Sequence, residues 1–287
     1  MTNLKCFFDD ATNTISHVVW DESSGKAAII DSVLDFDQAS GGTSTHSADE
    51  LLSFIMGGGL KLEYILETHV HADHLTASKY LQGELGGKTA ISENIRGVQE
   101  IFAGVFNEDL DEIQAQGKFD IYLKDGDELA LGDLTIKAIA TPGHTPACMT
   151  FVIGDAAFVG DTLFMPDSGS ARCDFPEGCP KQLFNSIKKL FGLPDETRLF
   201  MCHDYGAGGA RDCAWQTTVG EEKAKNIHVG GDKTEADFVK MRTERDATLS
   251  MPKLLLPSVQ VNMRAGNFPA DEKNGISYLK LPLNYFD

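Results

Sequence analysis

The chain has 287 residues, of which 42% are hydrophobic and 24% charged, and these ordinary values exclude collagen-like, coiled-coil and disordered classes. Its 43 acidic and 25 basic residues give a formal net charge of −18, so no overall positive field attracts nucleic acid or an anionic membrane. No apolar stretch has the length of a membrane span or of a secretory signal, so the sequence predicts a cytoplasmic protein without a membrane segment.

The apolar pattern predicts strands followed by helices, in two similar rounds. The first round has expected strands at residues 5–9, 15–20, 26–31 and 62–68, and expected helices at 47–56, 74–85 and 93–106. The second round has expected strands at residues 119–123, 128–131, 134–140, 147–153, 156–159 and 198–202, and expected helices at 180–191, 217–226 and 234–248. Two such rounds favour two packed sheets with helices outside over one doubly wound parallel sheet.

The tail at residues 252–287 contains Pro257, Pro269 and Pro282. Proline removes a backbone donor and interrupts helices and central strands. We therefore expect an extended C-terminal arm there, as part of a single domain that covers residues 1–287.

The six cysteines are scattered along the chain and form no C-x-x-C pair. A zinc knuckle or a thioredoxin-type redox motif is therefore not expected. Cys148 and Cys202 fall in expected strands, where a free thiol usually behaves as a small hydrophobic side chain of the core.

A dense group of metal-ligand residues lies at residues 68–74, where a strand is expected to end. It supplies His69, His71, Asp73 and His74 in an H-x-H-x-D-H spacing. Random placement of the chain's residues would produce this pattern in about 5 of 10,000 chains, so a chance match is a poor explanation. His nitrogens and Asp oxygens suit zinc or iron, and a tight turn at a strand end can aim several of them into one space.

Three further ligand types also follow expected strands. His144 lies in a turn after the strand at 134–140, Asp161 follows the strand at 156–159, and His203 follows the strand at 198–202. Any one of these residues alone would be explained as a capping or hydrogen-bonded polar residue. Together with the dense motif, they predict one metal site at one edge of the two sheets. The remaining histidines, which lack such a context, are expected to be structural or surface residues: His17, His46 and His228.

These seven residues match, one by one, the ligand motifs of the metallo-β-lactamase superfamily, which the whole chain resembles. The resemblance implies a mixed α+β fold, the metallo-β-lactamase αβ/βα four-layer sandwich, in which two mixed β-sheets are flanked by helices. It places the metal at one edge of the two sheets.

Within this superfamily the chain resembles the persulfide dioxygenases, also called sulfur dioxygenases, which are related to glyoxalase II. The similarity lies in LFMPDSGSARCDF at residues 163–175, HDY at 203–205 and PSVQVNMRAG at 257–266. The resemblance implies one Fe(II) per chain, held by His69, His144 and Asp161 as a facial triad with open positions for substrate and O2. The other motif residues would then orient these ligands or hold a second metal: His71, Asp73, His74 and His203.

The implied reaction is the oxidation of glutathione persulfide by O2 and water to sulfite and the thiol, in sulfide detoxification. Glutathione carries carboxylates, so arginines should bind it through bidentate hydrogen bonds. Arg172 and Arg264 lie in the stretches that carry the resemblance and are candidate substrate residues, with Tyr205 as a possible hydrogen-bond donor. A structural ion pair of Arg172 with Asp174 is the competing explanation. Family members are often dimeric, so a homodimer is expected.

The same seven residues could instead hold two metals, zinc or a mixture, as in glyoxalase II. His69, His71 and His144 would bind one ion and a second set the other, with Asp161 as a bridge; the second set is Asp73, His74 and His203. Two metals would favour a thioester hydrolase over an iron dioxygenase, because a metal-bound water can act as the nucleophile. Ligand identity alone does not separate these alternatives.

Overall fold

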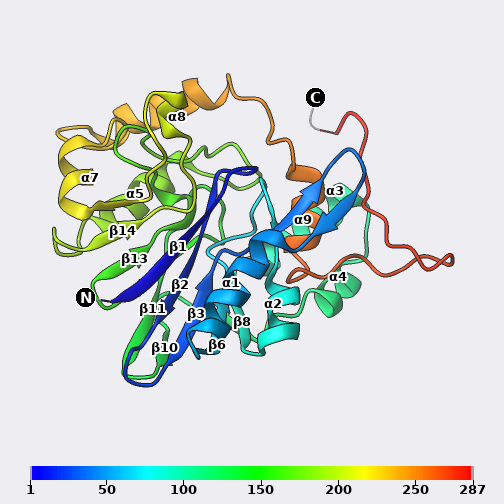
Figure 1. The fold of residues 1–287 in the computed structure, drawn as a ribbon. Coiled ribbons are helices and arrows are strands. Elements are labelled where there is room, and N and C mark those ends of the chain that lie inside the picture. The colour runs from blue at the N-terminus through cyan, green and yellow to red at the C-terminus, as the bar shows by residue number, and fades with distance from the viewer. Residues whose placement is uncertain (1, 286–287) are drawn as a thin grey trace.

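The computed structural model describes residues 2–285. Its first sheet has six strands in the order β1-β2-β3-β6-β8-β9 (Figure 1). The pairs β1–β2 and β2–β3 are antiparallel, whereas β3, β6, β8 and β9 run parallel, so the sheet is mixed. The strands are β1 (Asn3–Asp9), β2 (Thr14–Trp20), β3 (Lys26–Ile30), β6 (Lys61–Leu66), β8 (Lys88–Ser92) and β9 (Ile121–Leu123).

The second sheet also has six strands, in the order β10-β11-β12-β13-β14-β15. Only β13 and β14 pair in parallel, and the other pairs are antiparallel. The strands are β10 (Glu128–Leu131), β11 (Leu134–Ala140), β12 (Met149–Ile153), β13 (Ala156–Phe158), β14 (Arg198–Phe200) and β15 (Gln216–Thr218). A third, small antiparallel sheet joins β5 (Gly42–Ser44), β4 (Val33–Asp37) and β7 (Leu75–Thr76).

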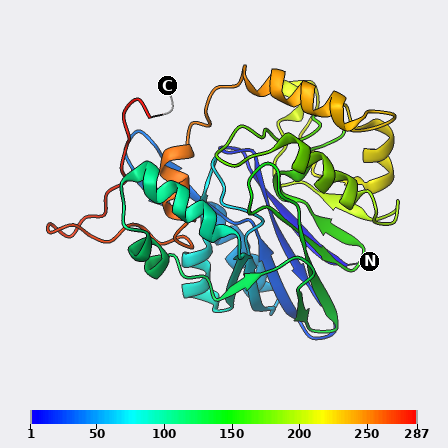
Figure 2. The same cartoon turned by 180° about the vertical axis from the view of Figure 1, so that it is seen from behind.

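Helices cover both outer faces of the two large sheets, as Figures 1 and 2 show from opposite sides. α1 and α2 pack on the first sheet, and α5 and α8 lie over the second. The helices are α1 (His46–Gly57), α2 (Ser78–Leu85), α3 (Ile95–Phe106), α4 (Leu110–Gln116), α5 (Pro180–Leu190), α6 (Gly206–Gly209), α7 (Val219–Lys225), α8 (Glu235–Asp246) and α9 (Leu255–Asn262). Among residues 2–285, no helix is both long and apolar enough to cross a membrane.

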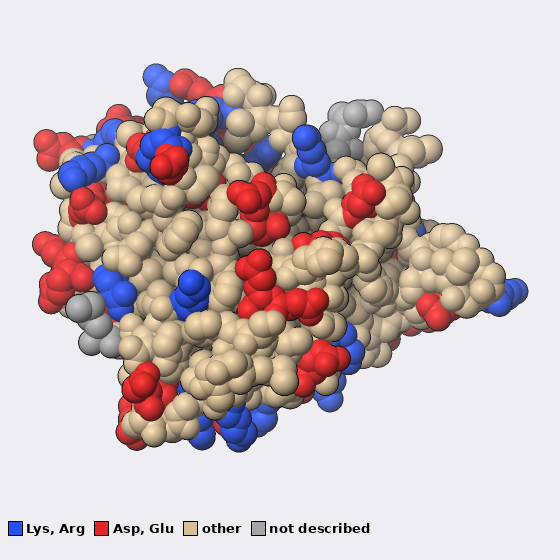
Figure 3. All heavy atoms as spheres, in the orientation of Figure 1, with Lys and Arg blue, Asp and Glu red and all other residues tan. Residues whose placement is uncertain are grey.

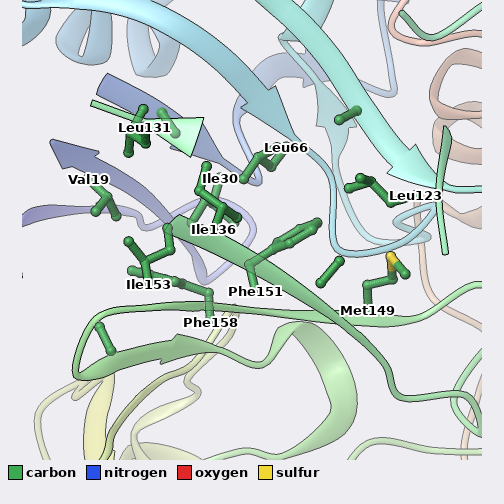
Figure 4. Packing of buried hydrophobic residues seen from close by; sticks show 14 of the residues in the cluster. Val19, Ile30, Leu66, Leu123, Leu131, Ile136, Met149, Phe151, Ile153 and Phe158 are labelled. Carbon is green, nitrogen blue, oxygen red and sulfur yellow. The ribbon is translucent and has the colours of Figure 1, made fainter. Parts of the chain in front are cut away.

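Apolar side chains of the two large sheets meet in the centre of the molecule (Figure 4). Ile30 and Leu66 come from the first sheet, and Ile136, Phe151 and Phe158 from the second, and all five are buried. The alternation of apolar residues along these strands places one face of each sheet in this core. The packing confirms the expectation of two mixed sheets between layers of helices.

Two expected helices begin later than predicted, and some elements were not predicted. The helix expected at residues 74–85 begins only at Ser78, because Leu75 and Thr76 pair with β4 as strand β7. The helix expected at 217–226 is preceded by β15, which pairs with β14. Strand β8 was not predicted, although it completes the parallel part of the first sheet.

The expected extended arm at residues 252–287 is also wrong in its first part. Residues Leu255–Asn262 form helix α9, and every residue from Pro257 to Asn262 is buried. Pro257 is tolerated because it lies in the first turn, where a backbone N–H has no partner within the helix. The side chains of Leu255 and Val259 pack with those of α3, so this segment belongs to the core of the protein.

We predict that Phe151→Ala lowers the free energy of unfolding by about 3–5 kcal/mol, because it leaves a cavity between the two sheets. Phe151 is completely buried in the central cluster. Leu283→Ala is the control, since Leu283 is 79% exposed and should change stability by less than about 0.5 kcal/mol. Urea unfolding followed by circular dichroism measures both. Equal effects of the two substitutions would contradict this description of the core.

Candidate metal centre

Four chain segments bring the predicted ligands together at the ends of strands. The H-x-H-x-D-H segment follows β6, His144 lies between β11 and β12, Asp161 follows β13, and His203 follows β14. The structure forms two groups whose potential ligand atoms all lie within 4.8 Å of one another. The first group is His69, His144 and Asp161, and the second is His71, Asp73, His74 and His203. All seven residues expected from the sequence therefore meet in one place.

In the first group, Asp161 lies between the two histidines. Its Oδ2 is 4.0 Å from Nε2 of His69 and 3.8 Å from Nε2 of His144. All three residues are buried, with at most 7% of each exposed. Two imidazole nitrogens and one carboxylate oxygen thus point at a common space, which is the ligand set of a 2-His-1-carboxylate site.

In the second group, Asp73 lies between two histidines. Its Oδ2 is 3.1 Å from Nε2 of His203, and its Oδ1 is 3.3 Å from Nδ1 of His74. Asp161 also reaches this group, because its Oδ1 is 3.5 Å from Nε2 of His203. The carboxylate of Asp161 therefore offers one oxygen to each group. His71 lies with the second group and not with the first, unlike the two-metal arrangement considered from the sequence.

Asp31, at the end of β3, orients the first part of the motif. Its carboxylate accepts hydrogen bonds from the backbone N–H and the hydroxyl of Thr68, at 2.8 and 2.9 Å, and from Nε2 of His71 at 3.0 Å. The hydroxyl of Thr68 in turn accepts from Nδ1 of His69 at 3.0 Å. This donation leaves Nε2 of His69 unprotonated and facing Asp161, as a metal ligand requires.

The charges around the two neighbouring histidines move their pKa values in opposite directions. Burial, together with the adjacent His71 and His144, holds the pKa of His69 well below its ordinary value. Burial alone would also lower the pKa of His71, but the carboxylates of Asp31 and Glu67 raise it well above that value. The lowered pKa keeps the imidazole of His69 neutral, as a metal ligand requires. His71 pairs with Asp31 through Nε2, and its Nδ1 has no hydrogen-bond partner within residues 2–285.

His144 is oriented by the loop that follows Asp161. Its Nδ1 donates to the backbone carbonyl of Arg172 at 2.8 Å, which leaves Nε2 free to face Asp161. The ring of Phe175 lies edge-to-face against the imidazole, with the ring centroids 5.1 Å apart. The imidazole is thus fixed in both its tautomer and its orientation.

Gly160 allows the turn that carries Asp161 to approach the motif closely. Its φ is +51°, a left-handed conformation that glycine adopts without a Cβ clash. A Cβ at this position would lie 2.5 Å from the hydroxyl oxygen of Thr68. Any other residue would therefore push Asp161 away from His69.

The ligand set fits a bound cation, because several of its buried polar atoms have no hydrogen-bond partner within residues 2–285. These atoms are Nδ1 of His71, Oδ1 of Asp73, Nε2 of His74, Oδ1 of Asp161 and Nε2 of His203. A buried polar atom without a partner costs about 1–3 kcal/mol, so such a concentration needs an explanation. A cation coordinated by these lone pairs supplies it.

Two further supporting residues were not recognised in the sequence. Asn262 of α9 donates to the backbone carbonyls of His71 and His74, both at 2.8 Å, and accepts from the backbone N–H of Thr76. Buried Glu67 accepts from the hydroxyls of Thr76 and Ser78. The sequence offered a signal for Asp31, since it is the last residue of an expected strand, whereas nothing local in the tail indicates the contact made by Asn262.

A cleft of about 940 Å³ opens over the site. Asp73, His144 and Asp161 form its floor, and the loop after Asp161 and the segment around Leu249 form parts of its walls. Four basic residues also line it: Arg172, Arg242, Arg245 and Lys253. The cleft is large enough for a peptide-sized ligand to reach the metal ligands.

The three predicted substrate residues lie in different places. Tyr205 is half exposed and lines the cleft. Arg172 lines it too, but its guanidinium donates twice to Asp174, at 2.6 Å each, and once to the carbonyl of Ser250, also at 2.6 Å. The structural ion pair considered from the sequence is therefore present.

Arg264 lies outside the cleft. It is 3% exposed, and its guanidinium donates to the carboxylate of Glu108, to Oε1 of Gln116 and to the carbonyl of Gln260. The substrate role expected for Arg264 is therefore not supported, since its donors are occupied within the fold.

The histidines expected to be structural or on the surface lie outside both groups. Nδ1 of His228 accepts from the backbone N–H of Ser170, and burial lowers its pKa to about 4. His17 is buried, with Nε2 3.1 Å from the carbonyl of Met201, and burial lowers its pKa to about 4 as well. His46 is exposed at the start of α1.

The sequence profile of the metallo-beta-lactamase superfamily matches residues 11–203, which include the whole candidate site. The chain belongs to this superfamily.

Three curated relatives are similar over most of the chain. A Burkholderia pseudomallei protein named "Probable metallo-hydrolase" is 52% identical over 97% of this chain and 98% of its own length. Glyoxylase B2 of Dictyostelium discoideum is 47% identical over 93% of this chain and 92% of its own. The human mitochondrial persulfide dioxygenase ETHE1 is 31% identical over 92% of this chain and 88% of its own.

Among solved structures, ETHE1 from Myxococcus xanthus aligns with a TM-score of 0.74 at 29% sequence identity. The alignment covers 92% of this chain and 100% of that protein. The superfamily fold, with its mixed sheets flanked by helices, is therefore confirmed for this chain, and the names of its relatives include both an oxygenase and hydrolases.

We predict that Asp31→Asn weakens metal binding by about 10–100-fold, because an amide cannot replace the carboxylate that holds both Thr68 and His71. Asp37→Asn is the control, since Asp37 lies at an exposed strand end away from the site. Competition with a chromophoric chelator gives the affinities, and circular dichroism verifies folding. An unchanged affinity of the Asp31→Asn protein would show that this carboxylate does not position the ligands.

Proposed function

We propose that this protein is an iron-dependent persulfide dioxygenase that oxidises glutathione persulfide in sulfide detoxification. The observation that carries the proposal is the group of His69, His144 and Asp161, two of which form the floor of the cleft. These three residues would hold a metal by three ligands, and a facial triad of this kind leaves positions open for substrate and O2. The name and 31% identity of the human persulfide dioxygenase support the same activity.

The reaction is balanced as R–S–SH + O2 + H2O giving R–SH, sulfite and two protons. The terminal sulfur is oxidised, O2 is reduced, and the S–S bond breaks with the thiol as the leaving group. Iron would supply the redox chemistry at adjacent open positions. The protein's own residues orient the ligand imidazoles through Thr68 and the Arg172 carbonyl, and Phe175 shields one side of His144 from water.

Two cations at the cleft suit the carboxylates of glutathione. Arg245 and Lys253 line the cleft, and neither forms an ion pair with another side chain in the described part of the protein, unlike Arg172. The protein as a whole does not attract an anion, because its net charge is −18, and acidic groups gather in several places on the face shown in Figure 3. We therefore propose that Arg245 and Lys253 bind the carboxylates of the substrate. Its peptide groups would lie near Tyr205. A homodimer and a cytoplasmic location stay predictions.

We predict that Fe(II)-loaded protein consumes O2 and forms sulfite in equal amounts when fresh glutathione persulfide is added. His69→Ala, His144→Ala and Asp161→Ala should each abolish both iron binding and turnover, since each removes one of three ligands. Oxygen electrode traces, sulfite assays and iron analysis measure these outcomes. His46→Ala is the control, because this exposed histidine lies outside the site.

Full iron occupancy in any of the three variants would refute the ligand assignment. Absence of O2 uptake with iron bound would refute the proposed dioxygenase activity.

The second candidate function, a thioester hydrolase with two metals, would then be favoured. Its support is the second ligand group beside the first and the 47% identity to Glyoxylase B2. Two metals per chain and hydrolysis of a glutathione thioester without O2 would establish it.

We predict that Arg245→Ala and Lys253→Ala each raise KM for glutathione persulfide about two- to fivefold with little change in kcat, as expected for exposed ion pairs worth about 0.5–1 kcal/mol. Steady-state O2 uptake measures both constants. Lys240→Ala is a matched control, because Lys240 lies on the same helix as Arg245 but does not line the cleft. Equal KM values for all three variants would remove these cations from the substrate site.

A further inference from the structure

Cys202 is buried, as the sequence predicted, and it also lies beside the metal centre. It follows β14 and is 1% exposed. Within residues 2–285 it belongs to none of the four apolar clusters, whereas Cys173 packs among the apolar side chains under α5 and α8. Burial as a small hydrophobic side chain therefore does not by itself account for the polar neighbours of this thiol.

The neighbours of the Cys202 thiol are potential metal ligands. Its Sγ and one ligand atom each of Asp161 and His203 lie within 4.8 Å of one another. The same holds for its Sγ with Asp31 and His71. The thiol thus lies on the inner side of the centre, where the two ligand groups meet.

A second observation points to a ligand at this place. Oδ1 of Asp161 and Nε2 of His203 are buried, lack hydrogen-bond partners within residues 2–285, and are 3.5 Å apart. In a tetrahedral zinc site, nitrogen and oxygen ligands at about 2.0–2.1 Å from the ion are separated by about 3.3–3.5 Å. The spacing of these two atoms therefore already matches one edge of such a site.

We propose that Cys202 supplies a sulfur ligand, together with Asp161 and His203, to a thiophilic divalent ion of the zinc class on the inner side of this centre. The proposal rests on the metal centre but not on the oxidation of persulfide. On binding, the S–H bond breaks, a sulfur–metal bond forms, and the proton leaves to solvent, with no change of oxidation state.

A sulfur ligand changes which metals the centre prefers. Thiolate favours zinc, cobalt and copper over magnesium, calcium and manganese, whereas an all-nitrogen-and-oxygen set discriminates less. Asp161 can serve this ion through Oδ1 while its Oδ2 faces His69 and His144. The chain can therefore hold a thiolate-bound ion at a position distinct from that of the triad.

The test uses the full chain, stripped of metal with a chelator and titrated with Co2+ under anaerobic conditions. Thiolate coordination gives a sulfur-to-cobalt charge-transfer band in the near ultraviolet, which nitrogen and oxygen ligands do not produce. We expect this band in the unaltered protein. It should be absent in Cys202→Ser, with cobalt binding about 10–100-fold weaker. Cys148→Ser is the matched control and should keep the band, because this buried thiol contacts Thr145 and no ligand group.

Two further outcomes make the assignment decisive. His69→Ala should keep the band, since His69 belongs only to the triad. Loss of the band in that variant would contradict a cobalt site on the inner side of the centre. Identical spectra of the unaltered and Cys202→Ser proteins would overturn the sulfur ligand. Cys202→Ala, checked by circular dichroism, repeats the comparison if the serine variant does not fold. O2 uptake with persulfide is a separate measurement, so either proposal can fail while the other stands.

Discussion

The buried carboxylate of Asp31 is the contact on which the geometry of the centre depends. It lies where β3 ends, next to the parallel end of β6, and it receives three hydrogen bonds from Thr68 and His71. A buried carboxylate is stable only if such partners surround it. The chain leaving β6 must therefore turn so that Thr68 and His71 face Asp31, and this turn also directs His69 toward Asp161.

The second half of the chain supplies the complementary constraint. His144 is fixed by the carbonyl of Arg172, and the loop that carries this carbonyl is held from behind by α8. Arg242 of α8 donates to the carbonyl of Ser170 at 3.0 Å, and Asp246 accepts from the backbone N–H of Cys173 at 2.9 Å. A helix outside the second sheet thus determines the orientation of a ligand, and the same helix carries Arg245 to the cleft.

Electrostatics explain why the cleft and the metal site belong together in so acidic a protein. Asp31 and Asp161 are buried, and the partly buried Asp73 lies beside them. A bound cation would offset the mutual repulsion of these carboxylates. An anionic substrate must overcome the net charge of −18, which only local cations at the cleft can achieve.

The sequence by itself determined the class of the fold and the seven candidate ligands that the structure brings together. Period-2 and helical patterns are local, and ligand residues at strand ends share one edge once two sheets are assumed, so His144 and Asp161 could be assigned without coordinates. The tertiary structure decided the matters that depend on distant contacts. Strand β7 replaces the start of a helix because of β4, and the proline-containing tail becomes α9 because it fills an apolar gap beside α3.

The same distinction separates two of the arginines and the two cysteines expected in the core. Arg264 and Arg245 look alike in the sequence, but burial beside Glu108 occupies the first, and exposure at the cleft leaves the second available. Cys148 and Cys202 both fall in strands expected from the sequence, yet only the second meets ligand residues from other segments. These differences arise from packing between segments far apart in the chain, which local residue patterns do not encode.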